Sequence, residues 1–178
     1  IIDTKEIILK GMHNYQNIMA AIIVAKHYGV EDEIINKVVK KFKGVEHRLE
    51  FVKGLDGKKY YNDSKATNLV STQIALKSFD KDILLILGGY ERGQDFKELI
   101  PYLDNVKVIL AIGENRERVK KELSNYNVIV KETLKEAMKN IRDYDVDIVL
   151  LSPASASWDQ YKKFEDRGEE FKNIVNNL

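Results

Sequence analysis

After Gly44 the sequence alternates short apolar runs with longer amphipathic segments, and this alternation constrains the fold more than any other feature. Short apolar runs indicate buried strands, whereas apolar residues at helical spacing indicate helices that cover a sheet. Strands that alternate with helices form a mainly parallel sheet with helices on both faces. We therefore predict an α/β fold. The expected strands are 49–52, 58–62, 83–87, 106–112, 127–130 and 147–151, and the expected helices are 69–79, 95–103, 114–123, 133–141 and 161–178.

Local signals support several of these boundaries. The segment Gly54–Gly57, which contains Asp-Gly, predicts a hairpin between the first two strands. Thr133 and Glu136 form a capping box at the start of a helix, and Asp95 and Glu98 form a weaker version of it.

Two amphipathic segments precede the alternation. Their apolar spacing predicts helices over 14–28 and 31–42, which Gly29 and Gly44 would end. Neither segment resembles a parallel strand, so we place a domain boundary near residues 44–47. The chain does not begin with Met, and we interpret it as a piece of a longer protein.

The composition excludes several classes of function. Lys+Arg 29 against Asp+Glu 28 gives a net charge of +1, so no field favours nucleic acid or an anionic membrane. The absence of cysteine excludes disulfides, thiolate metal sites and a Cys nucleophile, and it fits a cytoplasmic location. The apolar runs are too short to span a bilayer. The histidines and acids show no metal-ligand spacing, so we expect no metal site in this chain.

Three polar segments each follow a predicted strand directly. We call them the first polar turn (Asn62–Asn68), the second polar turn (Gly88–Gly93) and the third polar turn (Ser152–Gln160). In an open α/β sheet, ligands bind beyond the carboxyl ends of the strands. The sequence therefore predicts one site at one edge of the sheet.

The first polar turn combines an acid, an ammonium group and hydroxyls. Asp63 suits a ribose or a metal, Lys65 a phosphate oxygen, and Ser64 and Thr67 a carboxylate or phosphate beside a helix N-terminus. The alternative is that Asp63, Ser64, Thr67 or Asn68 serves simply as a helix N-cap.

The other two turns have their own alternatives. In the second polar turn the paired glycines allow close backbone approach to a ligand, and Arg92 suits a carboxylate, although a flexible loop with a solvated Arg explains it equally well. In the third polar turn the Ser hydroxyls suit a carboxylate. Its alternative is that Ser157 caps a helix and Trp158 fills a core.

Candidates also lie outside the turns. Arg48 follows the proposed boundary and can reach a phosphate, unless it is a surface ion-pairing Arg. Asn17 offers a donor and an acceptor for a base edge, whereas His13 and Asn14 are as readily explained by capping.

These segments occur in an order that resembles the Mur ligase family, and within it the members that add D-glutamate in peptidoglycan synthesis. The resemblance runs nearly end to end, and the first and third polar turns are specific to the D-glutamate adders. It implies a Rossmann-like C-terminal domain over 47–178, preceded over 1–46 by the last helices of a central ATPase domain. The segments are Gly11–Asn17, Glu46–Glu50, Asn62–Asn68, Leu87–Gly89, Leu151–Gln160 and Phe164–Gly168.

The resemblance implies an ATP-dependent ligase that joins D-glutamate to UDP-N-acetylmuramoyl-L-alanine through an acyl phosphate, with Mg²⁺. The phosphate-binding loop, the magnesium ligands and the uridine site are expected upstream, because this chain contains none of these segments. We therefore expect the chain to be inactive alone, and we expect a monomer.

The resemblance also assigns roles residue by residue. Asn17 resembles the residue that contacts adenine, and Arg48 and Asp63 resemble the ATP-contacting pair. Lys65 and Arg48 are the expected catalytic residues. The residues that resemble those around D-glutamate are Lys65, Thr67, Ser157, Phe164, which acts largely through its backbone, and Arg92, which replaces the usual Lys. Ser155 replaces a Cys that is common in the family.

Two other interpretations remain open at this point. The chain could belong to another amide ligase of the same superfamily, or to a nucleotide-binding module without catalysis. A phosphate-binding loop upstream of Ile1 would favour a ligase, and a panel of amino-acid substrates would separate the ligases from one another.

Overall fold

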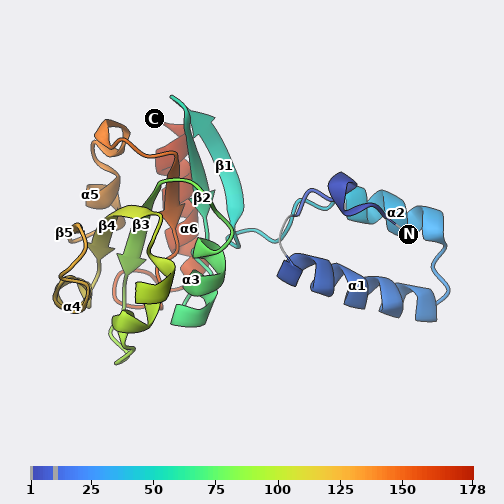
Figure 1. Cartoon of the computed structure of the whole chain (residues 1–178), viewed down its shortest axis with the longest axis horizontal. Coiled ribbons are helices and arrows are strands. Elements are labelled where there is room, and N and C mark those ends of the chain that lie inside the picture. Colours follow the sequence, from blue (N-terminus) through green and yellow to red (C-terminus); the bar gives the residue numbers. More distant parts are fainter. Residues whose placement is uncertain (1, 10–11) are drawn as a thin grey trace. The chain divides into compact units, whose positions relative to one another are not determined.

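The computed structural model describes residues 2–9 and 12–178, and the chain divides into two compact units, Ile1–Val45 and Glu46–Leu178 (Figure 1). Gly11, which belongs to the first segment of the family resemblance, lies outside the described residues, as does the side chain of His13.

The N-terminal unit is built around two helices. A short 3₁₀-helix, η1 (Thr4–Glu6), precedes α1 (Met12–His27) and α2 (Asp32–Lys41). Gly29 lies between the two long helices with a φ of 76°, a left-handed conformation that ends many helices. Both predicted helices are confirmed. Among the described residues of this unit only Ile7 and Ile35 are buried, so the unit buries little apolar surface within itself.

The second unit is built on a six-stranded sheet in the order β1-β2-β6-β3-β4-β5. Within the described residues β1 and β2 pair antiparallel, and all other neighbours pair parallel. The predicted mainly parallel sheet is therefore confirmed. The strands are β1 (Glu50–Leu55), β2 (Lys58–Asn62), β3 (Ile83–Gly88), β4 (Val106–Ile112), β5 (Val128–Val130) and β6 (Ile148–Leu151).

The predicted hairpin forms, but its turn is tighter than the sequence suggested. β1 continues through Leu55, which leaves Asp56 and Gly57 as the two loop residues. Both have positive φ, 52° and 79°, which matches the twist of the flanking strands in a two-residue hairpin.

Helices cover both faces of the sheet, as predicted. Because neighbouring strand residues point to opposite faces, β3 sends Leu85 and Leu87 into one core and Leu84 and Ile86 into the other. The first core is covered by α3 (Leu69–Leu76), the 3₁₀-helix η2 (Phe96–Tyr102) and α4 (Arg116–Glu122). The second is covered by α5 (Leu134–Met138), the 3₁₀-helix η3 (Ile141–Asp143) and α6 (Phe164–Asn176).

Some helices differ from the expectation. Residues 96–102 form a 3₁₀-helix rather than an α-helix, and Pro101 within it lacks the N–H that an α-helix would use. The helix expected over 133–141 ends at Met138, because Asn140 adopts a left-handed φ of 60°. The last helix begins at Phe164 rather than Tyr161, so residues 152–163 form an irregular segment after β6.

Candidate functional site

The three polar turns lie together at one edge of the sheet. Asn62 pairs with Leu151, and Leu151 pairs with Ile86, so β2, β6 and β3 end at neighbouring positions. The chain leaves β2 and β3 towards the face covered by α3 and η2, and it leaves β6 towards α6 on the other face. Open α/β sheets bind ligands where the connections reverse in this way. The predicted common edge is confirmed.

The N-cap of α3 is Asn68. The capping interpretation of the first polar turn therefore holds for this one residue. The Asn68 side chain accepts a hydrogen bond from the N–H of Ser71 at 2.9 Å. One residue therefore caps the helix, and Asp63, Ser64, Lys65 and Thr67 are left for other contacts.

Asp63 is buried and holds three segments together. Its Oδ1 accepts from the N–H of Leu49 at 3.1 Å, and its Oδ2 accepts from the hydroxyl of Ser152 at 2.7 Å. Burial raises the pKa of this carboxyl to about 6, although the two hydrogen bonds and the charge of Arg48 act in the opposite direction. Asp63 thus joins the first polar turn to the third and to the backbone beside Arg48.

Arg48 is exposed on a strained backbone. Its neighbours His47 and Leu49 have φ values of 62° and 43°, a region that non-glycine residues seldom occupy. Side chains around it maintain this conformation: the N–H of His47 donates to Glu50 Oε2 at 2.9 Å, and the His47 ring contacts the amide of Asn62 at 2.9 Å. The conformation therefore fixes where the Arg48 side chain leaves the backbone.

Lys65 and Phe164 lie where the first polar turn meets α6. The carbonyl of Phe164 accepts from the Ser64 hydroxyl at 2.8 Å, and the Lys65 ammonium lies 5.7 Å from the centre of the Phe164 ring. The half-buried hydroxyl of Thr67 makes no hydrogen bond to another described residue. An ammonium group is thus placed beside the start of α6, and the first polar turn also carries an available hydroxyl.

The paired glycines of the second polar turn, Gly88 and Gly89, are closely packed and do not belong to an open loop. Both are buried, and a Cβ on Gly89 would lie 2.5 Å from the carbonyl oxygen of Ala156. The N–H of Gly89 also donates to Asn115 Oδ1 at 2.9 Å. Arg92, farther along this turn, is exposed, and its guanidinium lies 5.6 Å from the ring of Trp158.

The structure excludes the capping and core interpretation of the third polar turn. No α-helix starts at Ser157 in the described chain, because the next one begins at Phe164. Trp158 is 61% exposed and packs against Tyr90, with ring centres 5.9 Å apart. Ser157 itself is 1% exposed, and its hydroxyl has no hydrogen-bond partner among the described residues.

Comparison with known proteins gives a consistent result. No protein-family model matches the chain. A UDP-N-acetylmuramoylalanine–D-glutamate ligase of Bacillus cereus is 44% identical over the whole chain, and one of Bacillus anthracis is 43% identical. The chain spans 41% of the length of each of these relatives.

Solved structures with the same fold include Mur ligases. A UDP-N-acetylmuramate-alanine ligase of Thermotoga maritima covers 95% of this chain with a TM-score of 0.68 at 14% identity, and the match takes 39% of that protein. MurF of Acinetobacter baumannii covers 91% with a TM-score of 0.67 at 19% identity, again over 39% of that protein.

The chain is homologous to the D-glutamate-adding Mur ligases. At 14–19% identity the solved structures support the fold alone, whereas the Bacillus relatives support the family. The predicted family resemblance and the α/β fold are confirmed.

Two residues of this Mur ligase homologue were missed in the sequence. Asn115 follows β4 and donates to the hydroxyl of Ser155 at 3.0 Å, and Arg167 in α6 lies buried beneath the turns. Asn115 had a usable signal, because Gly113-Glu114-Asn115 repeats the pattern of polar residues after a strand. Arg167 belongs to the segment Phe164–Gly168 of the family resemblance, but no role was predicted for it.

Asn17, the predicted adenine contact of this Mur ligase homologue, is an exposed residue of α1 in the N-terminal unit. Asn14, on the same helix, is half-buried. The remaining site residues belong to the second unit, where the structure brings Asp63, Lys65, Thr67, Arg92, Ser157 and Phe164 to the edge formed by the three polar turns.

A possible metal-ligand group in the described residues consists of Glu46, His47 and Glu169, with ligand atoms within 4.8 Å of one another. The ammonium of Lys172 contacts Glu46 and lies 3.0 Å from Glu169 and 3.4 Å from Glu50. A cation of the protein thus already neutralises these carboxylates.

None of the helices in the described part of the chain has the length and apolar character needed to cross a membrane.

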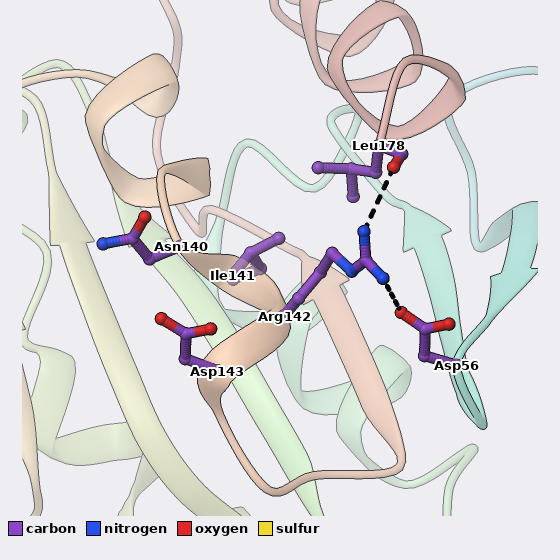
Figure 2. Close-up of a pocket in the computed structure, with 6 residues that line it drawn as sticks. All are labelled: Asp56, Asn140, Ile141, Arg142, Asp143 and Leu178. Atoms are coloured by element: carbon purple, nitrogen blue, oxygen red, sulfur yellow. Dashed lines mark hydrogen bonds and ion pairs between the residues drawn. The ribbon is translucent and has the colours of Figure 1, made fainter.

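An open hollow of about 560 Å³ lies at the other end of the strands (Figure 2). Asp56 precedes β2 and η3 precedes β6, whereas the polar turns follow these strands. Arg142 occupies this hollow, paired with Asp56 at 2.5 Å and with the carbonyl of Leu178 at 3.4 Å (Figure 2). None of the predicted site residues lines it, so it is separate from the candidate site.

Proposed function

We propose that this chain is the C-terminal part of an ATP-dependent ligase that adds D-glutamate to UDP-N-acetylmuramoyl-L-alanine in peptidoglycan synthesis. Relatives named for that reaction match its whole length at 44% identity, and the chain spans 41% of theirs. We assign residues 1–46 to the end of a central ATPase domain and residues 47–178 to a Rossmann-like C-terminal domain. We place the whole protein in the cytoplasm, as a monomer.

One observation of the site carries the amino-acid side of this proposal. The hydroxyl of Ser157 is buried and has no partner among the described residues. Leaving such a group unpaired costs about 1–3 kcal/mol, so a ligand atom that accepts its hydrogen bond is favoured. A carboxylate oxygen is such an acceptor, and Lys65 and Arg92 bring cations to the neighbouring turns.

D-Glutamate has two carboxylates, and the site offers two kinds of group for them. The hydroxyls of Thr67 and Ser157 can each donate one hydrogen bond to a carboxylate. Lys65 and Arg92 add positive charge, although the planar Arg fork meets a carboxylate differently from an ammonium group. Phe164 contributes through its backbone.

The nucleotide side rests on Arg48, Asp63 and Asn17. Arg48 is exposed and permanently charged, which suits a phosphate oxygen. Asp63 already accepts two hydrogen bonds, and an ionised carboxylate has about four lone-pair sites, so it can still accept from a ribose hydroxyl. Asn17 can pair with an adenine edge. We assign the Mg²⁺ ligands and the phosphate-binding loop to the rest of the protein.

In the proposed reaction ATP transfers its terminal phosphoryl group to the carboxylate of UDP-N-acetylmuramoyl-L-alanine. The amine of D-glutamate attacks the acyl carbon of this acyl phosphate, the amide bond forms, and inorganic phosphate leaves. Lys65 and Arg48 stabilise negative charge that develops on the transferring groups.

The test is phosphate release by the longer protein that contains this chain. The assay supplies ATP, Mg²⁺, UDP-N-acetylmuramoyl-L-alanine and one amino acid chosen from D-glutamate, L-glutamate, meso-diaminopimelate, L-lysine and L-alanine. Of the five amino acids, we expect only D-glutamate to support phosphate release by the longer protein. We expect no phosphate release by the isolated chain. Turnover with another amino acid would indicate a different amide ligase, and nucleotide binding without turnover would indicate a non-catalytic module.

A matched pair of variants tests the role of Ser157 within that assay. Ser157→Ala removes the unpaired hydroxyl, and we expect KM for D-glutamate to rise about tenfold, as loss of one hydrogen bond to a charged group predicts. Ser124→Ala removes an exposed hydroxyl and should leave KM unchanged. Equal behaviour of the two variants would contradict the assignment.

A further inference from the structure

Arg167 is a buried guanidinium at the base of the candidate site. It lies in α6, and 1% of its surface is exposed. Its Nε donates to the hydroxyl of Ser64 at 3.0 Å, and its Nη2 donates to the carbonyl of Ser64 at 2.9 Å. The same Nη2 donates to the carbonyl of Ser155 at 3.0 Å, and Nη1 donates to that of Ala156 at 3.4 Å.

These hydrogen bonds connect the first and third polar turns, and the second turn packs against the same side chain. Ser64 belongs to the first turn, and Ser155 and Ala156 belong to the third. The second turn lies against the same group, because a Cβ on Gly89 would stand 3.1 Å from Nη1 of Arg167. One planar side chain therefore sets the relative positions of segments that follow β2, β3 and β6.

The charge of Arg167 is not paired with a carboxylate. All four hydrogen bonds end on carbonyl or hydroxyl oxygens, and none of the ion pairs among the described residues includes it. Burial lowers its pKa to about 10, while Asp159 acts on it through space in the opposite sense, so it remains a cation near neutral pH. Buried charges normally have a partner, because an unpaired one loses the solvation of water.

A second polar group close to this cation in the chain also lacks a partner within the described residues. Ser157 follows Ala156, whose carbonyl Arg167 holds, and the Ser157 hydroxyl is buried without a partner of its own among the described residues. An anionic ligand bound at the three turns would satisfy that hydroxyl. It would also bring negative charge towards the buried guanidinium.

We propose that Arg167 is a positioning residue for the amino-acid substrate, which holds the three polar turns in register and whose charge is balanced by the substrate carboxylates. The inference rests on the proposed function and adds to it a residue that acts from beneath the site. Without the guanidinium, the first and third turns lose their common hydrogen-bond partner, and the carboxylates lose a charge that water does not screen.

The kinetic test uses the longer protein with Arg167→Met, Arg167→Lys and the matched control Arg142→Met. Arg142 is the same residue type, but it lies at the other end of the strands. For Arg167→Met we expect KM for D-glutamate to rise at least about tenfold, with a smaller change in KM for ATP. Arg167→Lys keeps the charge and should recover part of the loss, whereas Arg142→Met should match the wild type.

A second measurement on the wild-type protein avoids dependence on a variant that fails to fold. The Nε–H of Arg167 is buried and hydrogen-bonded, so its NMR resonance should be observable, and through-bond correlation to the Arg167 backbone assigns it. We expect this resonance to shift on addition of D-glutamate with ADP.

The outcomes separate the two proposals. Absence of D-glutamate-dependent turnover in the wild type would refute the proposed function and this inference with it. Normal turnover of the wild type would refute the inference alone if Arg167→Met kept the wild-type KM for D-glutamate. An Arg167 resonance that does not shift at saturating D-glutamate and ADP would also refute the inference alone.

Discussion

The buried carboxyl of Asp63 should make the stability of this chain depend on pH. Burial raises its pKa from 3.8 to about 6, against the hydrogen bonds from Ser152 and from the N–H of Leu49. The folded chain therefore binds this proton more tightly than the unfolded chain does. The stability contributed by the proton is complete below pH 3.8 and is lost as the pH rises through about 6. The difference between 3.8 and 6 corresponds to about 3 kcal/mol.

Asp63→Asn removes this titration while keeping an oxygen for the N–H of Leu49. The free energy of unfolding of the variant, compared with that of the wild type, should therefore rise by about 2 kcal/mol between pH 4 and pH 7.5, because part of the full effect lies below pH 4. Urea denaturation followed by circular dichroism at half-unit pH steps measures both curves. Taking the difference between the two proteins cancels the contributions of the histidines.

A further variant checks the direction of the argument. Ser152→Ala removes a hydrogen bond that favours the ionised form of Asp63, so the fall in stability should move to higher pH. If wild type and Asp63→Asn give parallel curves from pH 4 to pH 7.5, the burial of this carboxyl does not govern its proton affinity and the reasoning is wrong.

Two other substitutions test the packing and capping around the site. Gly168→Ala would place a Cβ 2.2 Å from Nδ1 of the buried His47, and we expect a loss of about 1–3 kcal/mol in the free energy of unfolding. Gly54→Ala is the control, because its nearest neighbours lie at 3.9 Å, and similar losses for both in urea denaturation would contradict the steric reasoning. Asn68→Ala should cost about 1 kcal/mol by removing the N-cap of α3, and Asn68→Ser should keep most of that stability. Equal losses for Ala and Ser, measured the same way, would mean that the cap is not the stabilising contact.

The strands and the common edge of the site were predictable because they depend on local patterns. Apolar runs identify strands that are buried on both faces, and β3, all of whose residues are buried, is the clearest case. Successive parallel strands end at the same edge, so polar residues after β2, β3 and β6 had to gather there. Helix ends were predicted less well where one residue decides them, as Asn140 does after α5.

The contacts within the site were less predictable, because they join residues far apart in the chain. Arg167 bonds to Ser64 across 103 positions, and Asp63 bonds to Ser152 across 89. A buried Arg without a carboxylate partner also runs against the usual preference of Arg for the surface. Trp158 shows the opposite departure from the usual preference, because this large aromatic residue, for which a core position was the alternative interpretation, lies exposed beside Tyr90.

The sequence by itself therefore determined the α/β class, the three polar turns and the family resemblance. Each of these depends on the spacing and type of residues that are close together in the sequence. The tertiary structure decided which turns touch. β6, the last strand in the chain, inserts between β2 and β3, and this strand order places the third polar turn between the other two. Strand order depends on long-range packing of the sheet against its helices, and it is this packing that lets one buried guanidinium reach all three turns.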